Sequence, residues 1–263
     1  MKTGIVATGD PRFALTLFYY LKLRSCKPEC IILIKRNIFS KIKRASFPRI
    51  LDSLQERCNN RQTGQRRCSR DYLAEFARRQ EIKLPGFSLS RICKIEKMRL
   101  FITDDVNNSR VIDYLRNAQI DLLLNTGGGL YKSEVISTVR TGILNAHMGP
   151  LPEFRGMNVM EWSLFYGRDI GVTLHFIDKG IDTGDILLFK TIPIESGDTI
   201  EDLRNKSGIV NIELFYTAIK CISENKLERT TQLKDEGKQY FVMHPRLRSI
   251  VENRLSNSFV SKI

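Results

Sequence analysis

Hydrophobic residues at the start of the chain form short runs separated by one longer apolar and aromatic segment. The pattern predicts a strand over Lys2–Ala7, a helix over Phe13–Leu23 and a second strand over Cys30–Ile34. The order strand, turn, helix, strand begins a βαβ unit, in which the crossover is right-handed in nearly all proteins. We therefore predict that the chain opens as a parallel α/β sheet.

The same alternation resumes in the second third of the chain. Apolar and amphipathic runs predict, in order, a strand, a helix, a strand, a helix and a strand over Arg99–Thr103, Ser109–Ala118, Ile120–Leu124, Lys132–Val139 and Gly142–Leu144. The third run is apolar apart from Asp121 and has the composition of a central parallel strand, covered on both faces. The predicted fold is α/β and Rossmann-like, with a mostly parallel twisted sheet and helices on both faces.

The segment between about residues 38 and 91 interrupts this order. Two helix-like pieces, around residues 48–58 and 71–82, flank a polar turn at 59–69 in which Cys68 is the one apolar residue. Ser69 or Asp71 is suited to cap the second piece. We predict a helical insertion in the sheet domain.

Positive charge is concentrated in this insertion. The net charge is +13, and thirteen Lys or Arg stand against four Asp or Glu between Lys35 and Arg79, a local excess of nine. A solvated helical segment, a basic lid over an anionic substrate and a nucleic-acid surface are all compatible with such charge. Nucleic-acid binding usually adds interleaved aromatic side chains, and this segment has only four, so an insertion or lid is favoured.

Length and composition restrict the class of protein. With 263 residues, 42% of them hydrophobic, the chain can bury the core of one α/β domain with a small appendage. No apolar run approaches the ~20 residues that span a bilayer, and the start lacks a secretory signal, so we expect a cytoplasmic protein. The six cysteines suggest neither a disulfide scaffold nor a zinc site, and no metal is predicted.

An amide and an imidazole follow the predicted strand at residues 142–144. Asn145 and His147 are two residues apart, so in an extended conformation they point to the same face. The later segment Gly171–Ile186 alternates apolar and polar residues and then enters a glycine-framed loop that carries Asp182. Asn145 and Asp182 could each serve only as turn formers. Together, the amide, imidazole and carboxylate suffice for acyl-transfer chemistry, and we predict them as the catalytic residues.

Several motifs around these residues resemble those of the folate-dependent formyltransferases. Asn145-Ala146-His147 is similar to the family's Asn-x-His, and Leu151–Gly156 (LPEFRG) to its Leu-Pro-x-[aromatic]-[Arg/Lys]-Gly. Gly171–His175 (GVTLH) and Asp182–Leu187 (DTGDIL) resemble its Gly-x-Thr-x-His and Asp-x-Gly-x-Ile elements. The resemblance covers residues 99–200 well, the first 35 loosely and the basic insertion not at all.

This resemblance implies the formyltransferase fold and a reaction. A formyl group would pass from 10-formyltetrahydrofolate, as formyl donor, to a primary amine through a tetrahedral oxyanion. Asn145 and His147 would donate hydrogen bonds to that oxyanion. Asp182 would orient His147 or a water, or accept a proton.

The resemblance also implies where the folate lies. Its pterin and formyl arm are expected between two loops that hold it largely through backbone groups, with the contact residues Gly129, Leu130, Tyr131, Lys179, Gly180 and Ile181. The alternative for the glycines at 127–129 is a tight strand–helix turn. Arg155 is expected either to bind a substrate anion or to brace its loop. His175 and Trp162 are expected in the core.

The turn after the first strand distinguishes branches of the family. Its sequence, TGDPRF at residues 8–13, is not the GxGxxG of dinucleotide-binding proteins. It also lacks the phosphate loop of glycinamide ribonucleotide formyltransferases, and it resembles the turn of the methionyl-tRNA and sugar formyltransferase branch. Asp10 in this turn is a further candidate for substrate binding.

The last part of the chain bears on the amine acceptor. We expect a helix over Thr199–Asn225, a hairpin over Thr230–Val242 and a basic tail, hence a catalytic domain at 1–200 and a small extension at 201–263. The C-terminal barrel of methionyl-tRNA formyltransferases is not expected. By elimination, the acceptor is a nucleotide-linked amino sugar, whose phosphates suit the positive charge. The alternatives are a tRNA-directed formyltransferase that uses the basic insertion, and a non-catalytic folate- or nucleotide-binding module.

Overall fold

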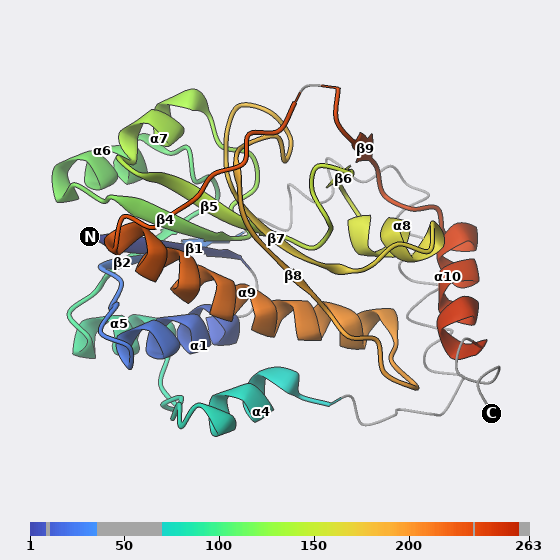
Figure 1. The fold of residues 1–263 in the computed structure, drawn as a ribbon. Coiled ribbons are helices and arrows are strands. Elements are labelled where there is room, and N and C mark those ends of the chain that lie inside the picture. The colour runs from blue at the N-terminus through green and yellow to red at the C-terminus, as the bar shows by residue number, and fades with distance from the viewer. Residues whose placement is uncertain (9–10, 36–69, 234, 258–263) are drawn as a thin grey trace.

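The structure, a computed structural model, describes residues 1–8, 11–35, 70–233 and 235–257 (Figure 1). The strands of its main sheet are β1 (Thr3–Thr8), β2 (Cys30–Ile34), β3 (Arg99–Thr103), β4 (Leu122–Thr126), β5 (Gly142–His147), β7 (Gly171–Phe176) and β8 (Ile186–Thr191). They lie in the order β3-β2-β1-β4-β5-β7-β8. The first five are parallel, and β7 and β8 are antiparallel to their neighbours. The predicted α/β fold with a mostly parallel sheet is confirmed.

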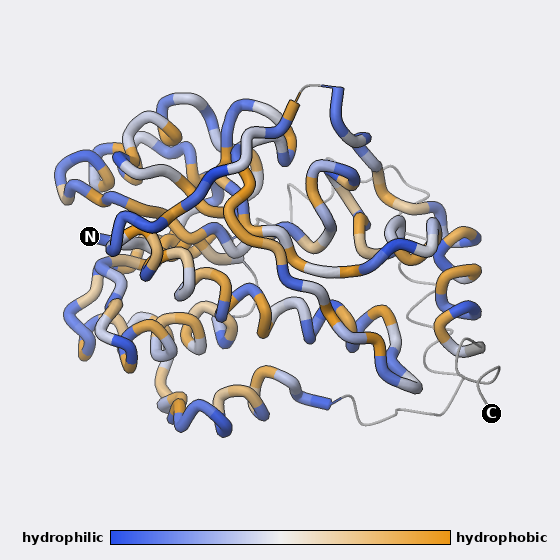
Figure 2. The backbone as a smooth tube through the Cα atoms, viewed as in Figure 1, coloured by the Kyte–Doolittle hydropathy of each residue, from blue (hydrophilic) through white to orange (hydrophobic). Residues whose placement is uncertain are grey.

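Helices cover both faces of this sheet (Figure 1). On one face lie α1 (Pro11–Lys22) and α9 (Ile200–Ser223), and on the other lie α6 (Ser109–Ala118) and α7 (Ser133–Thr138). Alternate strand residues enter two separate hydrophobic clusters, with Leu122 and Leu124 on the α1 side and Leu123 on the α6 side. This two-sided burial explains why the central strands are almost continuously apolar (Figure 2).

Most predicted elements are present, with shifts at their ends. The strands predicted at 30–34 and 99–103 and the helix predicted at 109–118 have the observed bounds. The strand predicted at 120–124 begins instead at Leu122. Gln119 ends α6 in a left-handed conformation and the Ile120 N–H donates to Leu115 O, so these residues close the helix.

Two helices are described in the region of the predicted insertion, α4 (Tyr72–Arg79) and α5 (Leu89–Ile95). Asp71 caps α4, because its side chain accepts a hydrogen bond of 3.0 Å from the Ala74 N–H. Phe76 of α4 is buried in the same cluster as α1 and α9. The helix-like piece expected around 48–58 and the turn at 59–69 lie outside the described residues.

The hairpin predicted over residues 230–242 is wrong. Thr230 makes an isolated bridge with Ile186, and β9 (Lys238–Tyr240) pairs in parallel with β6 (Phe154–Gly156). Each extended stretch is close in sequence to the other but finds its partner in a distant segment. The LPEFRG motif therefore forms its own small sheet with the C-terminal part of the chain.

The residues after position 200 share the core of the sheet. Leu203, Ile212 and Phe215 of α9 are buried against the strands. The last described helix, α10 (Pro245–Asn257), packs on α8 (Val159–Phe165). The boundary expected at residue 200 is thus not a boundary in packing. Within the described ranges, no helix has both the length and the apolar composition needed to span a bilayer.

Candidate active site

Asn145 and His147 lie on one face of β5, opposite a matching pair on β7. In the antiparallel register, Asn145 is directly opposite His175, and His147 is opposite Thr173. Residues two apart on a strand share a face, and directly opposed side chains are neighbours. Four polar side chains therefore form one patch on the sheet.

The Asn145 amide is held at both ends. Its Oδ1 accepts a hydrogen bond of 2.9 Å from Asn125 Nδ2, and its Nδ2 lies 3.0 Å from His175 Nε2. The other ring nitrogen, His175 Nδ1, lies 2.8 Å from Phe176 O, which can only accept, so Nδ1 carries the hydrogen. Nε2 then accepts from Asn145, and one N–H of the Asn145 amide is left for a ligand.

Asp182 reaches this patch from the loop between β7 and β8. Its Oδ2 lies 3.4 Å from His147 Nδ1 and accepts a hydrogen bond of 2.9 Å from the Gly156 N–H. Its Oδ1 lies 3.5 Å from His175 Nε2. The structure thus brings together the three residues predicted as catalytic, two from strand β5 and one from a loop.

His147 has a different main partner from the oxyanion that the resemblance implied. Its Nε2 lies 2.8 Å from Phe154 O, so in the neutral ring the N–H is donated to the main chain. Its Nδ1 faces the carboxylate of Asp182. In this arrangement Asn145 is the side chain that offers an N–H, and the His147–Asp182 pair can accept a proton at Nδ1.

The surroundings favour a neutral imidazole next to an ionised carboxylate. Burial lowers the pKa of His147, outweighing Asp182 and the Phe154 carbonyl, which raise it. Burial alone would raise the pKa of Asp182, but the His147 imidazole and the hydrogen bond from the Gly156 N–H bring that pKa below its ordinary value. An imidazole that is neutral at rest can take up a proton, and the adjacent carboxylate stabilises the imidazolium that forms. Such a pair is suited to general base catalysis.

The substitution Asp182→Asn should lower the pKa of His147 further, because it removes the anion that favours the imidazolium. The His147 ring would then stay neutral to a lower pH than in the wild type, which an NMR titration of its ring signals measures. The control Asp169→Asn removes an exposed carboxylate and should leave the titration unchanged. A pKa of His147 that rises or stays constant in Asp182→Asn would contradict this electrostatic account.

Two further motif residues, which the sequence did not single out, hold the loops around the site. Thr173 Oγ1 donates to Gly149 O at 2.6 Å and accepts from Leu151 N at 3.1 Å, which fixes the chain just after His147. Gly156 donates its N–H to Asp182, and a Cβ at this position would lie 2.2 Å from Tyr240 O. Only their places within the family motifs could have pointed to these roles.

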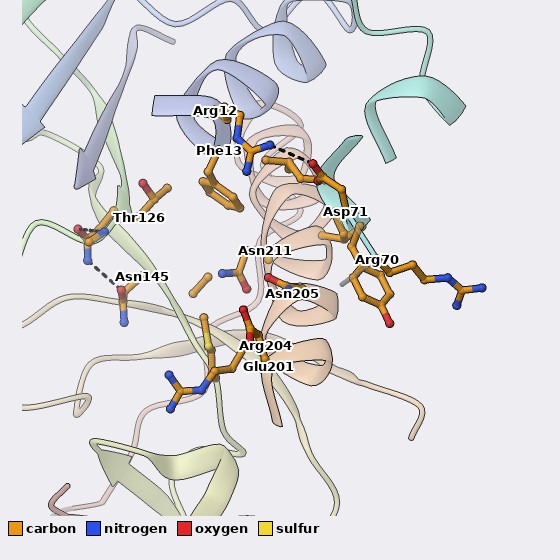
Figure 3. A pocket seen from close by; sticks show the side chains of 18 residues that line it. Arg12, Phe13, Arg70, Asp71, Thr126, Asn145, Glu201, Arg204, Asn205 and Asn211 are labelled. Carbon is orange, nitrogen blue, oxygen red and sulfur yellow. Dashed lines mark hydrogen bonds and ion pairs between the residues drawn. The ribbon is translucent and has the colours of Figure 1, made fainter. Parts of the chain in front are cut away.

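A cavity of about 650 Å³ lies beside Asn145 (Figure 3). Its walls are the ends of β4 and β5, the starts of α1 and α4, and one side of α9. Strands β2 and β3 lie on one side of β1, and β4 and β5 lie on the other, so the order of strand addition reverses between β1 and β4. Open α/β sheets bind ligands at such a switch point. Its charged lining residues are Arg12, Arg70, Asp71, Glu201 and Arg204. One ion pair joins two of its walls, Arg12 to Asp71, and Arg204 pairs with the buried Glu161 of α8, which is not a lining residue.

One lining residue has an unsatisfied atom. Asn211 of α9 is 9% exposed, and its Oδ1 is buried without a hydrogen-bond partner among the described residues. Figure 3 shows Asn211 on the helix side of the cavity and Asn145 on the sheet side. A buried carbonyl oxygen without a donor costs about 1–3 kcal/mol, so this position favours a ligand with an N–H or O–H group.

The loops predicted to hold the folate lie at the ends of β4 and β7. In the first, Gly129 and Leu130 are exposed, whereas Tyr131 is buried and donates its hydroxyl to Asn125 Oδ1 at 2.8 Å. In the second, Lys179 and Gly180 are exposed, as is Ile181, the Gly180 N–H being bonded to Asp178 Oδ1. Their role in folate binding stays a prediction.

The three glycines after β4 have different surroundings. A Cβ on Gly127 or Gly128 would lie 2.4 Å from Thr8 Oγ1 or 2.2 Å from Tyr131 Oη, respectively. The tight-turn alternative therefore explains these two. Gly129 has a φ of +84° and open space at its Cβ position, so its backbone is accessible to a ligand.

The structure favours the bracing interpretation of Arg155. This residue is 7% exposed, and its Nε and Nη2 donate to Gln232 Oε1 at 3.1 and 2.9 Å. Asp10 lies outside the described residues. Trp162 is partly buried against the core, stacks on Tyr166 and donates its Nε1–H to Phe241 O.

Comparison with known proteins gives matches in both sequence and fold. The family described as formyl transferase matches residues 69–219. The methionyl-tRNA formyltransferase of Caldanaerobacter subterraneus subsp. tengcongensis is 30% identical over 136 residues, which are 51% of this chain and 44% of that protein. The chain thus spans about half the length of the curated relatives it matches.

Two solved structures share the fold at low sequence identity. One is a phosphoribosylglycinamide formyltransferase from Bacillus halodurans, with a TM-score of 0.57 and 20% identity, covering 86% of this chain and 97% of that one. The other is the N-formyltransferase from Helicobacter canadensis in complex with folinic acid and dTDP-3-aminofucose, with a TM-score of 0.58 and 17% identity, covering 97% and 81%.

The family match begins at residue 69, inside the segment that the motifs left uncovered, and extends through β4, β5, β7 and most of α9. It includes Asn145, His147 and Asp182 together with the four motifs around them. This chain belongs to the formyl transferase family.

Proposed function

We propose that this protein is a folate-dependent N-formyltransferase that moves a formyl group from 10-formyltetrahydrofolate to the primary amine of a nucleotide-linked amino sugar. The observation that carries this proposal is the convergence of Asn145, His147 and Asp182 in a chain of the formyl transferase family. Asn145 is also a wall of the cavity at the switch point of the sheet. The reacting groups would meet at that wall.

The proposed reaction begins when the neutral amine attacks the formyl carbon. A C–N bond forms, the carbonyl oxygen becomes an oxyanion, and the remaining N–H of Asn145 donates to it. One such preorganised donor is worth ~10²–10³ in rate. The amine's proton passes to His147, whose imidazolium Asp182 stabilises. The bond from the formyl carbon to the folate nitrogen then breaks, and that nitrogen receives the proton.

The residues of the two predicted loops suit a folate donor. Leu130 is 78% exposed and Ile181 is 42% exposed, so both offer apolar surface to a flat pterin ring. Gly129, with its open backbone, can approach the ring closely. The helicobacter N-formyltransferase that shares this fold was solved with folinic acid, which supports the same class of donor here.

The cavity supports a nucleotide-linked amine as acceptor. Arginines on three of its walls can bind phosphate oxygens, and Phe13 and Tyr72 in its lining offer faces for a base. Asn211 Oδ1 can accept a hydrogen from the amine or a sugar hydroxyl. The same helicobacter protein was solved with dTDP-3-aminofucose, a substrate of this chemical kind.

The test is to incubate the protein with 10-formyltetrahydrofolate and a panel of nucleotide-linked amino sugars. Release of tetrahydrofolate and the mass of the N-formyl product are measured together. We expect turnover with at least one amine and none with the nucleotide sugar that has a hydroxyl in place of the amine. Release no faster than that of His147→Ala with every acceptor would overturn the proposal and favour a non-catalytic binding module.

A tRNA-directed formyltransferase is the second candidate. It is favoured by the relatives named as methionyl-tRNA formyltransferases and by the net charge of +13. Formylation of methionyl-tRNA in the same assay, with binding that weakens steeply as salt rises, would support this candidate over the sugar acceptor. Absence of binding at low salt would exclude it.

A further inference from the structure

A row of hydrogen-bonded side chains crosses three strands at the level of Asn145. In the sheet register, Asn125 of β4 is opposite Asn145 of β5, which is opposite His175 of β7. The links are Asn125 Nδ2 to Asn145 Oδ1 at 2.9 Å and Asn145 Nδ2 to His175 Nε2 at 3.0 Å. Asn125 is 7% exposed and His175 is 1% exposed, so both ends of the row are buried.

The direction of this row is set by backbone N–H groups. Gly127 and Gly128 place their N–H groups 3.2 and 2.5 Å from Asn125 Oδ1. Because a backbone N–H can only donate, this end of the Asn125 amide must be the oxygen. Tyr131 Oη lies 2.8 Å from the same atom, and burial raises the pKa of Tyr131 well above its ordinary value, so its hydroxyl also donates.

Each further link then has one allowed orientation. The NH₂ of Asn125 faces Asn145, which must present its oxygen there and its NH₂ to His175. His175 Nε2 must accept, so its hydrogen lies on Nδ1 and is donated to Phe176 O at 2.8 Å. A reversed amide at either asparagine would bring two donors or two acceptors into contact, which buried groups avoid.

We propose that Asn125 is a positioning residue that fixes which end of the Asn145 amide faces the reaction site. The Asn125 oxygen accepts from the N–H groups of the loop at 127–131, so the Asn125 NH₂ must face Asn145 and donate to its oxygen. The orientation of the Asn145 amide does not depend on the proposed function. Its effect on catalysis does rest on the proposed formyl transfer.

The row also links two parts of the site. Gly127, Gly128 and Tyr131 belong to the loop predicted to hold the folate, and all three donate to Asn125. The loop therefore holds Asn145 with its NH₂ toward His175 from one end of the row, and Phe176 O favours the same orientation from the other end.

The substitution Asn125→Asp should reverse the orientation of the Asn145 amide. A carboxylate keeps the oxygen that accepts from the loop and, with those donors around it, stays ionised. It cannot donate to Asn145, so Asn145 must turn its NH₂ toward it and its oxygen toward His175. His175 Nε2 must then carry a hydrogen.

Nitrogen NMR of the histidine rings reads this directly, since the chain has only three histidines. In the wild type we expect His175 with Nδ1 protonated and Nε2 unprotonated. In Asn125→Asp we expect Nε2 protonated. Two controls should keep the wild-type state: Tyr131→Phe, which removes one donor without reversing the row, and Asn205→Asp, which adds a carboxylate to the same cavity outside the row.

A protonated Nε2 in the wild type, or an unprotonated one in folded Asn125→Asp, would overturn the proposal. The wild-type spectrum tests the row even if the variant does not fold. None of these spectra needs a substrate, so they can fail independently of the proposed function. In a formylation assay, Asn125→Asp should lower kcat by ~10²–10³ with little change in KM for the acceptor, because an oxyanion donor is replaced by an oxygen. Wild-type kcat with a reversed row would overturn the catalytic part.

Discussion

The substitution His147→Ala should lower kcat for formyl transfer by ~10²–10⁴, the usual effect of losing a positioned acid–base group. In the proposed reaction this ring accepts the proton of the attacking amine, and its Nδ1 lies 3.4 Å from the Asp182 carboxylate that would stabilise the imidazolium. The measurement is tetrahydrofolate release under saturating donor and acceptor. Circular dichroism and thermal unfolding of the variant establish that it is folded.

The matched control is His244→Ala, the same chemical change at an exposed histidine before α10. This control should retain wild-type turnover. Near-normal turnover of His147→Ala would remove His147 from the reaction and with it the role assigned to its pair with Asp182. A loss of equal size in both variants would mean that the effect is not specific to the site.

Gly184→Ala should destabilise the protein strongly. A Cβ at Gly184 would lie 2.0 Å from Phe176 O and 2.9 Å from Phe176 C, both backbone atoms that cannot move aside by a rotamer change. Overpacking of this kind costs about 1–3 kcal/mol, and often more at rigid backbone. Phe176 O also accepts the Nδ1–H of His175, so the shift would disturb Asn145 as well.

Urea unfolding measures this cost, with Gly86→Ala as the control. Within the part of the chain that the structure describes, Gly86 has no atom within 4 Å of its Cβ position, so an alanine there meets no clash with those residues. We expect its free energy of unfolding to stay within about 0.5 kcal/mol of the wild type, as for most surface changes. Equal stability of the two variants would contradict the close approach of Gly184 to β7.

The sheet was predictable because its central strands are buried on both faces. Runs such as Cys30–Ile34 are apolar at every position, and capping residues mark the helices between them. The pairing of β6 with β9 was not predictable in the same way. It joins two three-residue strands far apart in the sequence, and neither has a periodicity of its own. The sequence reading paired β9 with its nearest extended neighbour and therefore predicted a hairpin.

The residues of the site were likewise predictable from local sequence, whereas their hydrogen-bond partners were not. The spacing of Asn145 and His147 on one strand, with the family motifs, was enough to predict three candidate catalytic residues that the structure brings together. The partners of these residues follow from strand register, which the sequence does not state. His175 was expected as a core histidine, and it is buried, but its place opposite Asn145 gives it a positioning contact. Asn125 precedes the glycines at 127–129 and belongs to none of the family motifs, so the sequence did not indicate its role.

We propose that the Asn145 amide receives the formyl oxygen of a folate bound between the loops at 127–131 and 179–181. A crystal structure with a non-transferring analogue of 10-formyltetrahydrofolate that keeps the formyl group tests this most directly. We predict the formyl oxygen roughly 2.7–3.1 Å from Asn145 Nδ2, the distance of an oxyanion donor, with the pterin between the two loops. A formyl oxygen directed away from Asn145, or a pterin bound elsewhere, would contradict the account.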